Sequence, residues 1–174
     1  MNGMEVYQVQ KADLLALQEI SRQTFFDTFA EVNTKEDMSQ YLEVNLSLDQ
    51  LAEELNNPST SFYFVKSNNE ILAYLKLNEA KAQTEKREVP SMEIERIYVR
   101  SEFQNRRVGQ FLLDFSIELT KFKQLKLIWL GVWEHNVSAI RFYERNRFQF
   151  FGKHAFMLGS DEQTDLLMER HLDQ

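Results

Sequence analysis

The stretch from Met92 to Phe122 decides the fold, and it reads MEIERIYVRSEFQNRRVGQFLLDFSIELTKF. Its first part, Met92 to Val99, alternates between two sets of residues and is rich in β-favouring types, so we predict a strand. Its last part carries apolar residues at helical spacing, which predicts an amphipathic helix. The apolar positions of that helix are Val108, Phe111, Leu112, Phe115, Leu119 and Phe122.

The turn between this strand and this helix is polar and basic, with Arg100, Arg106, Arg107 and one glycine, Gly109. A strand that runs directly into a helix points free backbone N–H groups and the positive end of the helix dipole toward one place. Such a place binds anions, and the adjacent arginines favour a phosphate. On local grounds alone, a solvated turn explains the same residues equally well.

The turn resembles motif A of the GCN5-related N-acetyltransferases (GNAT), Q/R-x-x-G-x-G/A, in which backbone amides hold the pyrophosphate of acetyl-CoA. Gln104 and Gly109 match the motif, whereas Arg107 stands where its first glycine is usual. The resemblance implies that the preceding strand pairs with the pantetheine amides and supplies an N–H group to the developing oxyanion. The cofactor-binding residues implied here are Ile97, Tyr98, Val99, Gln104, Asn105, Arg106, Arg107, Val108, Gly109 and Gln110.

The segment from Asn136 to Tyr143 resembles motif B of the same superfamily, N-x-x-A-x-x-F-Y. The resemblance implies that Asn136 and Tyr143 both contact the cofactor. It also implies that Tyr143 is the general acid that protonates the departing CoA thiolate. Without the resemblance, Tyr143 is a core aromatic residue and Asn136 an ordinary helix N-cap. A second departure from the family is Arg147, which replaces a usual glycine.

Residues 129–168 resemble a narrower group, the PaiA-type bacterial spermidine/spermine N-acetyltransferases. The similarity lies in GVWE at 131–134 and GKHAFMLG at 152–159, followed by Gln163, Asp165 and Met168. It implies a polyamine acceptor.

An amine must lose a proton before it attacks, and an alkylamine with a pKa of ~10.4 is mostly protonated at pH 7. A carboxylate, directly or through water, can take that proton and hold the cation beforehand. Glu95 is our candidate, at the strand position where eukaryotic polyamine acetyltransferases carry an acid. Glu93 lies on the same strand face. Two solvated strand carboxylates are the alternative. Further substrate-binding candidates are Glu31, Glu134 and Phe26, the last as an apolar wall or as plain core.

The composition of the chain argues against several other classes of protein. At 174 residues the chain is predicted to be a single domain, 1–174, with a packed core. It has no cysteine, which excludes a disulfide scaffold and thiolate catalysis and fits a cytoplasmic location. Three scattered histidines predict no metal site. A net charge of −7 disfavours nucleic acid. It would attract a cationic small molecule, although the same charge is explained equally by solubility alone.

Neither a signal peptide nor a membrane-spanning run is evident, so we expect no membrane partner. The sequence leaves the oligomeric state open and allows a homodimer.

The predicted fold is α/β (α+β in some schemes). It is a GNAT fold with a central mixed, mostly antiparallel sheet of six to seven strands, a splayed parallel pair that binds acetyl-CoA, and helices on both faces. The predicted strands are 5–10, 61–65, 71–77, 92–99, 125–133, 148–156 and 164–169. The predicted helices follow Asp13, span 35–46, 47–55 and 108–122, and follow Asn136. The polar segment 78–90 is expected to be a mobile loop.

We therefore expect an N-acetyltransferase that transfers acetyl directly from acetyl-CoA to a primary amine, with spermidine or spermine as the leading acceptor. One rival is an acetyltransferase for protein N-termini or lysines. A rival of another class is a CoA-binding regulatory protein without turnover, which the two arginines at family glycine positions would suggest.

Overall fold

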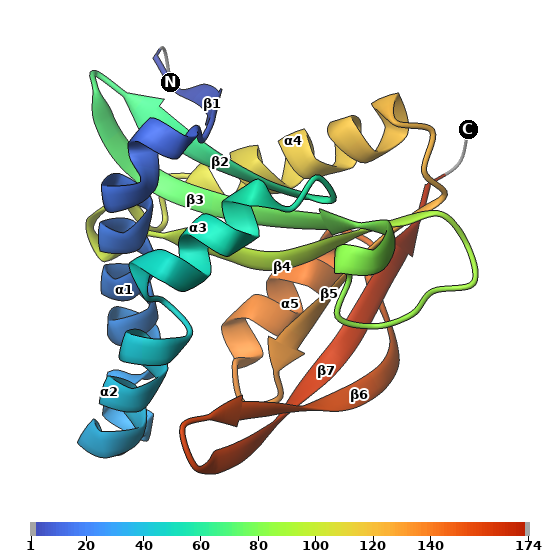
Figure 1. Ribbon diagram of the computed structural model, residues 1–174. Coiled ribbons are helices and arrows are strands. Elements are labelled where there is room, and N and C mark those ends of the chain that lie inside the picture. Colours follow the sequence, from blue (N-terminus) through green and yellow to red (C-terminus); the bar gives the residue numbers. More distant parts are fainter. Residues whose placement is uncertain (1–2, 173–174) are drawn as a thin grey trace.

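The computed structural model describes residues 3–172 and contains a seven-stranded sheet in the order β1-β2-β3-β4-β5-β7-β6 (Figure 1). The strands are β1 (Glu5–Gln8), β2 (Thr60–Ser67), β3 (Glu70–Glu79), β4 (Ser91–Val99), β5 (Leu127–Trp133), β6 (Gln149–Leu158) and β7 (Asp161–His171). All neighbouring strands are antiparallel except β4 and β5. This confirms the predicted mixed, mostly antiparallel sheet.

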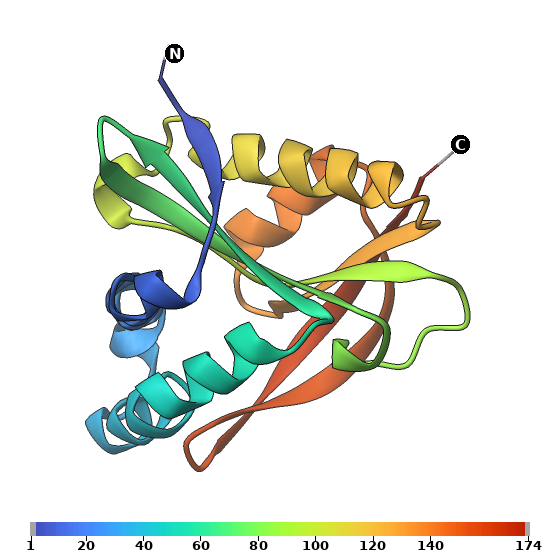
Figure 2. The ribbon, with the colours of Figure 1, turned by 45° about the horizontal axis from the view of Figure 1, so that its top comes forward.

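Helices cover both faces of the sheet (Figure 2). The helices are α1 (Leu14–Phe29), α2 (Lys35–Val44), α3 (Leu48–Asn56), α4 (Val108–Phe122) and α5 (Val137–Arg145). Helices α4 and α5 share one core cluster with the sheet, and α1, α2 and α3 share the other. Within the described residues, no helix is both long and apolar enough to cross a membrane.

The parallel pair β4–β5 separates part-way along its length. The pairing ends at Ile94 and Leu130, although β4 continues to Val99 and β5 to Trp133. Beyond that point the facing edges of the strands no longer pair with each other, so their backbone groups are free to bind something else. The predicted splayed pair is therefore present.

Local sequence explains the main boundaries. Asn68 and Asn69 turn the β2–β3 hairpin with φ angles of 49° and 66°, a left-handed conformation that asparagine tolerates. The side chains of Thr34 and Ser47 cap α2 and α3 by accepting backbone N–H bonds. Asp13 stands at the N-cap position of α1 but makes no such bond, because its carboxylate accepts the Gln10 N–H instead.

The polar segment after β3, predicted as a mobile loop, is a loop that hydrogen bonds attach to the sheet. It begins with a short 3-10 turn, η3 (Ala80–Ala82), and residues 83–87 then bond to four separate strands. We call residues 80–90 the strap. Its polar side chains form most of these hydrogen bonds. The periodicity of the sequence gives no sign of them, because the partners are distant in the chain.

Candidate active site

A cavity of about 1340 Å³ opens where β4 and β5 separate. This volume exceeds the roughly 300–1,000 Å³ of an ordinary ligand site, so it has room for two substrates. At one end it is lined by the start of α4 and by α5, and at the other by α1, α2, β6 and the strap. The predicted site residues that line it are Glu93, Glu95, Ile97, Tyr98, Val99, Gln104, Asn105, Arg107, Val108, Gly109, Gln110, Asn136 and Tyr143.

The start of α4 has the features of an anion site. The first backbone N–H groups of this 15-residue helix have no partner within the helix, and the helix dipole adds positive potential there. A Cβ placed on Gly109 would meet only the Val99 side chain, at an ordinary 3.8 Å. The protein's own packing therefore does not require this glycine, which suits a backbone left bare for a ligand.

Arginines occupy left-handed backbone positions at both places where the family usually has glycine. Arg107 has φ 64° and Arg147 has φ 66°. For a residue with a side chain this conformation costs roughly 1–2 kcal/mol, which explains why glycine is common there. The turn geometry that glycine would provide is nevertheless kept, and Arg107 adds a positive charge to the cavity wall.

Helix α5 presents Asn136 and Tyr143 to the cavity from the other side. The Asn136 side chain caps the helix by accepting the Ala139 N–H at 3.2 Å, so the N-cap role is present. Tyr143 is buried among Phe142 and Phe148, and burial raises the pKa of its hydroxyl. A tyrosine in this setting keeps its proton at neutral pH while its ring forms part of the core.

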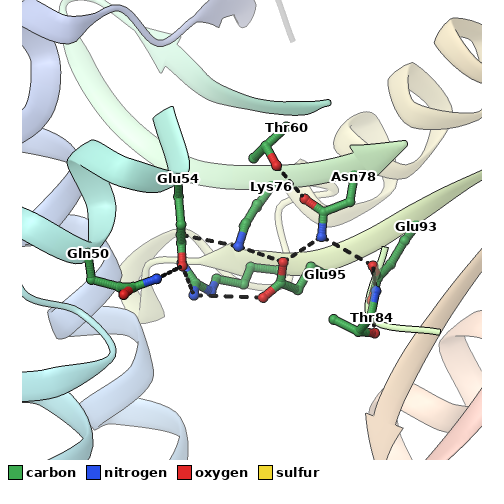
Figure 3. A network of polar contacts seen from close by, with 9 residues as sticks. Gln50, Glu54, Thr60, Lys76, Asn78, Thr84, Glu93 and Glu95 are labelled. Atoms are coloured by element: carbon green, nitrogen blue, oxygen red, sulfur yellow. Dashed lines mark hydrogen bonds and ion pairs between the residues drawn. The ribbon is translucent and has the colours of Figure 1, made fainter. Parts of the chain in front are cut away.

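Glu95 belongs to a network of ion pairs (Figure 3). Lys76 Nζ lies 2.6 Å from Glu95 Oε2 and 3.1 Å from Glu54 Oε2, and Arg96 forms a two-bond pair with Glu54. Burial alone would raise the pKa of Glu95, but the charges of Lys76 and Arg96 outweigh it and hold the pKa below its ordinary value. Two cations and two carboxylates thus neutralise one another.

Glu93 stands two residues away in a different environment. It is 3% exposed, and it accepts hydrogen bonds from the Thr84 N–H and hydroxyl and from Asn78 Nδ2. Burial raises its pKa against these bonds, and the nearby charge of Glu95 raises it further. Asn78 donates to both carboxylates, at 3.1 Å and 2.6 Å, as Figure 3 shows. Linked carboxyl groups with opposite pKa shifts are typical of a site that handles protons.

The strap carries a second charged cluster to the cavity wall. His154 on β6 lies 2.8 Å from Glu85 of the strap and 3.6 Å from Asp165 on β7. The nearby Asp165 carboxylate raises the pKa of His154 to about 8, against burial, and the hydrogen bond with Glu85 adds to the rise. At neutral pH one imidazolium therefore sits between two carboxylates.

Four predicted site residues do not line the cavity. Phe26 is 52% exposed, because the helical phase of α1 turns its neighbours Phe25 and Phe29 inward instead. Glu31 lies exposed in η2 (Ala30–Val32). The remaining two are Arg106, whose guanidinium lies over the Phe103 ring, and Glu134, whose carboxylate lies 3.7 Å from His135 Nε2.

Several charged and polar groups in or beside the cavity were not singled out from the sequence as site residues. The clearest signal was Lys76, a charge within the otherwise apolar strand run 71–77, which indicates a buried ion pair. Its cross-strand neighbour is Arg96, so two like charges face each other and require the carboxylates around them. Thr84 and Glu85 carried no comparable signal.

The sequence profile of the acetyltransferase (GNAT) family matches residues 15–148. An uncharacterized N-acetyltransferase in the pepI 3′ region of Lactobacillus delbrueckii subsp. lactis is 42% identical over 172 residues, which cover 99% of each chain. The chain belongs to the GNAT family. This GNAT protein is an N-acetyltransferase, and acetyl-CoA is its acetyl donor.

A further relative and a solved structure also resemble this chain. The spermine/spermidine N(1)-acetyltransferase of Bacillus subtilis is 33% identical over 64 residues, which cover 36% of this chain and 42% of that one. The crystal structure of the PaiA N-acetyltransferase from Thermoplasma acidophilum, in complex with coenzyme A, superposes with a TM-score of 0.79. It is 20% identical, covers 97% of this chain and 99% of its own, and confirms the predicted fold.

Proposed function

We propose that this GNAT enzyme acetylates a primary amine of a polyamine, spermidine or spermine, by direct attack on acetyl-CoA. The observation that carries the proposal is Glu93, a buried carboxylate in the cavity whose hydrogen bonds within residues 3–172 come from Thr84 and Asn78 and not from a cation. A cationic acceptor would supply the positive charge that this buried carboxylate lacks. The polyamine resemblance of residues 129–168 and the net charge of −7 agree with this choice.

Different residues bind acetyl-CoA and transfer protons. Acetyl-CoA supplies the acetyl group as a thioester when bound. The N–H groups at the start of α4 and the Arg107 side chain hold its phosphates, and the open edge of β4 at Ile97, Tyr98 and Val99 pairs with its pantetheine.

Glu93 takes the proton of the acceptor amine, since burial gives it a higher pKa and makes it the stronger base. Glu95, held ionised by Lys76 and Arg96, keeps the neighbouring potential negative and orients Asn78 toward Glu93. The sequence alone pointed to Glu95 as the base, and the paired state of its charge leads us to assign that role to Glu93. Tyr143 gives its proton to the leaving sulfur.

Gly109→Glu is expected to weaken acetyl-CoA binding by roughly 100-fold from a micromolar-range affinity of about −8 kcal/mol. The new carboxylate would stand where the phosphates bind, while an acid in the first helical turn leaves the helix itself stable. Calorimetry measures the affinity. Gly109→Ala is the matched control, since its Cβ makes only the 3.8 Å contact, and it should lose much less. Unchanged binding in a folded Gly109→Glu protein would remove the phosphates from this turn.

The acceptor is tested by kcat/KM at fixed acetyl-CoA for spermidine, butylamine and a peptide with a free N-terminus. We expect spermidine to exceed the peptide by roughly tenfold or more. Raising the salt concentration should weaken the use of spermidine more than that of butylamine, because more charges are screened. A tenfold preference for the peptide would refute the polyamine acceptor and leave the acetyltransferase assignment standing.

A further inference from the structure

The tip of the β6–β7 hairpin is docked on the start of α2. Asp37 Oδ1 accepts the Ser160 N–H at 2.7 Å and the Ser160 hydroxyl at 2.8 Å. Gln163 Nε2 donates to Asn33 Oδ1 at 2.9 Å. These bonds join segments that are 123 and 130 residues apart in the chain. We call this set of contacts the bridge.

Gly159, at the tip of the hairpin, is the residue that lets the hairpin approach α2 closely enough to form the bridge. Its φ of 63° is a left-handed turn conformation that asparagine would also tolerate. A Cβ on this residue, however, would lie 2.4 Å from Asp37 Oδ1 and 2.6 Å from Asp37 Cα. Both distances are far below van der Waals contact, so the close approach to α2, and not the turn alone, requires glycine here.

Aromatic side chains fill the space on the cavity side of the bridge. Tyr41 of α2 contacts Phe156 of β6 with ring centroids 5.8 Å apart, and Phe29 of α1 meets Trp133 of β5 at 6.1 Å. Phe25 stacks on Tyr41 at 4.1 Å. All five line the cavity. Helices and strands therefore touch across this end of it, between the cavity and the bridge.

We infer that the bridge makes the acceptor end of the cavity a blind pocket, which selects slender alkylamines and excludes amines that continue as a polypeptide. This inference rests on the proposed amine acceptor. A peptide needs ~3.3 Å of free path for each further residue, and its backbone groups need hydrogen-bond partners. An aromatic wall offers few such partners, whereas it packs well against the methylene chain of an alkylamine.

The test opens the bridge and measures acceptor choice. Gly159→Asn keeps the left-handed turn but collides with Asp37, and Asp37→Ala removes the acceptor of the Ser160 bonds. Glu162→Ala is the matched control, because it alters an exposed residue of the same hairpin that makes no bridge contact. For each protein, kcat/KM is measured for the N-terminal peptide and for whichever small amine the wild type uses best. Hydrogen exchange of the Ser160 amide reports whether the bridge has opened.

We expect Gly159→Asn and Asp37→Ala to lose protection at Ser160 and to raise the peptide-to-amine ratio of kcat/KM by roughly tenfold or more, with Glu162→Ala unchanged. An unchanged ratio after protection is lost would overturn the inference. So would protection that persists in both variants, or a wild-type enzyme that already prefers the peptide. A wild type that acetylates a small amine other than a polyamine would refute the polyamine acceptor alone, and the bridge would then be judged with that amine.

Discussion

Replacing Tyr143 by phenylalanine should lower kcat roughly 10- to 1000-fold and leave acetyl-CoA affinity nearly intact. The ring packs against Phe142 and Phe148, and phenylalanine preserves that packing. Only the hydroxyl is lost, and burial keeps that hydroxyl protonated until the leaving thiolate needs its proton. Steady-state kinetics and calorimetry on the same preparation separate turnover from binding.

Tyr63→Phe is the matched control for this variant. Tyr63 belongs to the same core cluster and packs edge-on against Phe115, but it does not line the cavity. Loss of its hydroxyl should leave kcat unchanged. Wild-type turnover in Tyr143→Phe would show that water or another group protonates the sulfur.

Replacing Glu93 by glutamine should lower kcat/KM for the amine roughly 100- to 10,000-fold at neutral pH. The substitution keeps size and most hydrogen bonding to Thr84 and Asn78 but removes the base. Without a base, the reaction depends on the free amine, which becomes abundant only as the pH approaches ~10. The variant's rate should therefore recover with rising pH, whereas the wild-type rate should fall at low pH, below the raised pKa of Glu93.

Glu95→Gln distinguishes the two carboxylates. Its charge balances Lys76 and Arg96, so its loss should reduce the free energy of unfolding more than it changes the shape of the pH–rate profile. Chemical denaturation and the pH–rate profile measure the two effects separately. If Glu95→Gln showed the recovery at high pH and Glu93→Gln did not, Glu95 would be the base.

The elements with a clear period were predictable from sequence. The strand at 92–99 and the helix at 108–122 match β4 and α4 within one residue, because β-favouring composition and helical spacing mark where each element runs. Burial followed the pattern less well, since the first four residues of β4 are all buried and Phe122, predicted on the apolar face of the helix, is 84% exposed. The hairpin at Asn68 and Asn69 followed from turn chemistry in the same way. Several ends were less accurate: β7 was predicted as 164–169 and runs from Asp161 to His171.

The charged part of the site was harder to predict, since it is assembled from distant segments. Glu54 of α3 reaches Arg96 across 42 residues, and no local pattern shows that pairing. Thr84 lies in a polar run that reads as a loop, although it covers Glu93. In α1, spacing alone did not show whether Phe26 or its neighbours Phe25 and Phe29 face the cavity, because that depends on how the helix rotates against the sheet.

The separation of β4 from β5 beyond Ile94 and Leu130 also bears on how long the protein survives in a cell. A ligand that binds the folded state alone adds about 2.7 kcal/mol of stability at one hundred times its dissociation constant. Proteases act on the open form, whose population falls as that stability rises. When acetyl-CoA is plentiful, the chain should resist degradation, and when it is scarce, the chain should be turned over faster. The gap in the sheet would thus tie the amount of enzyme, and not only its rate, to the supply of acetyl groups.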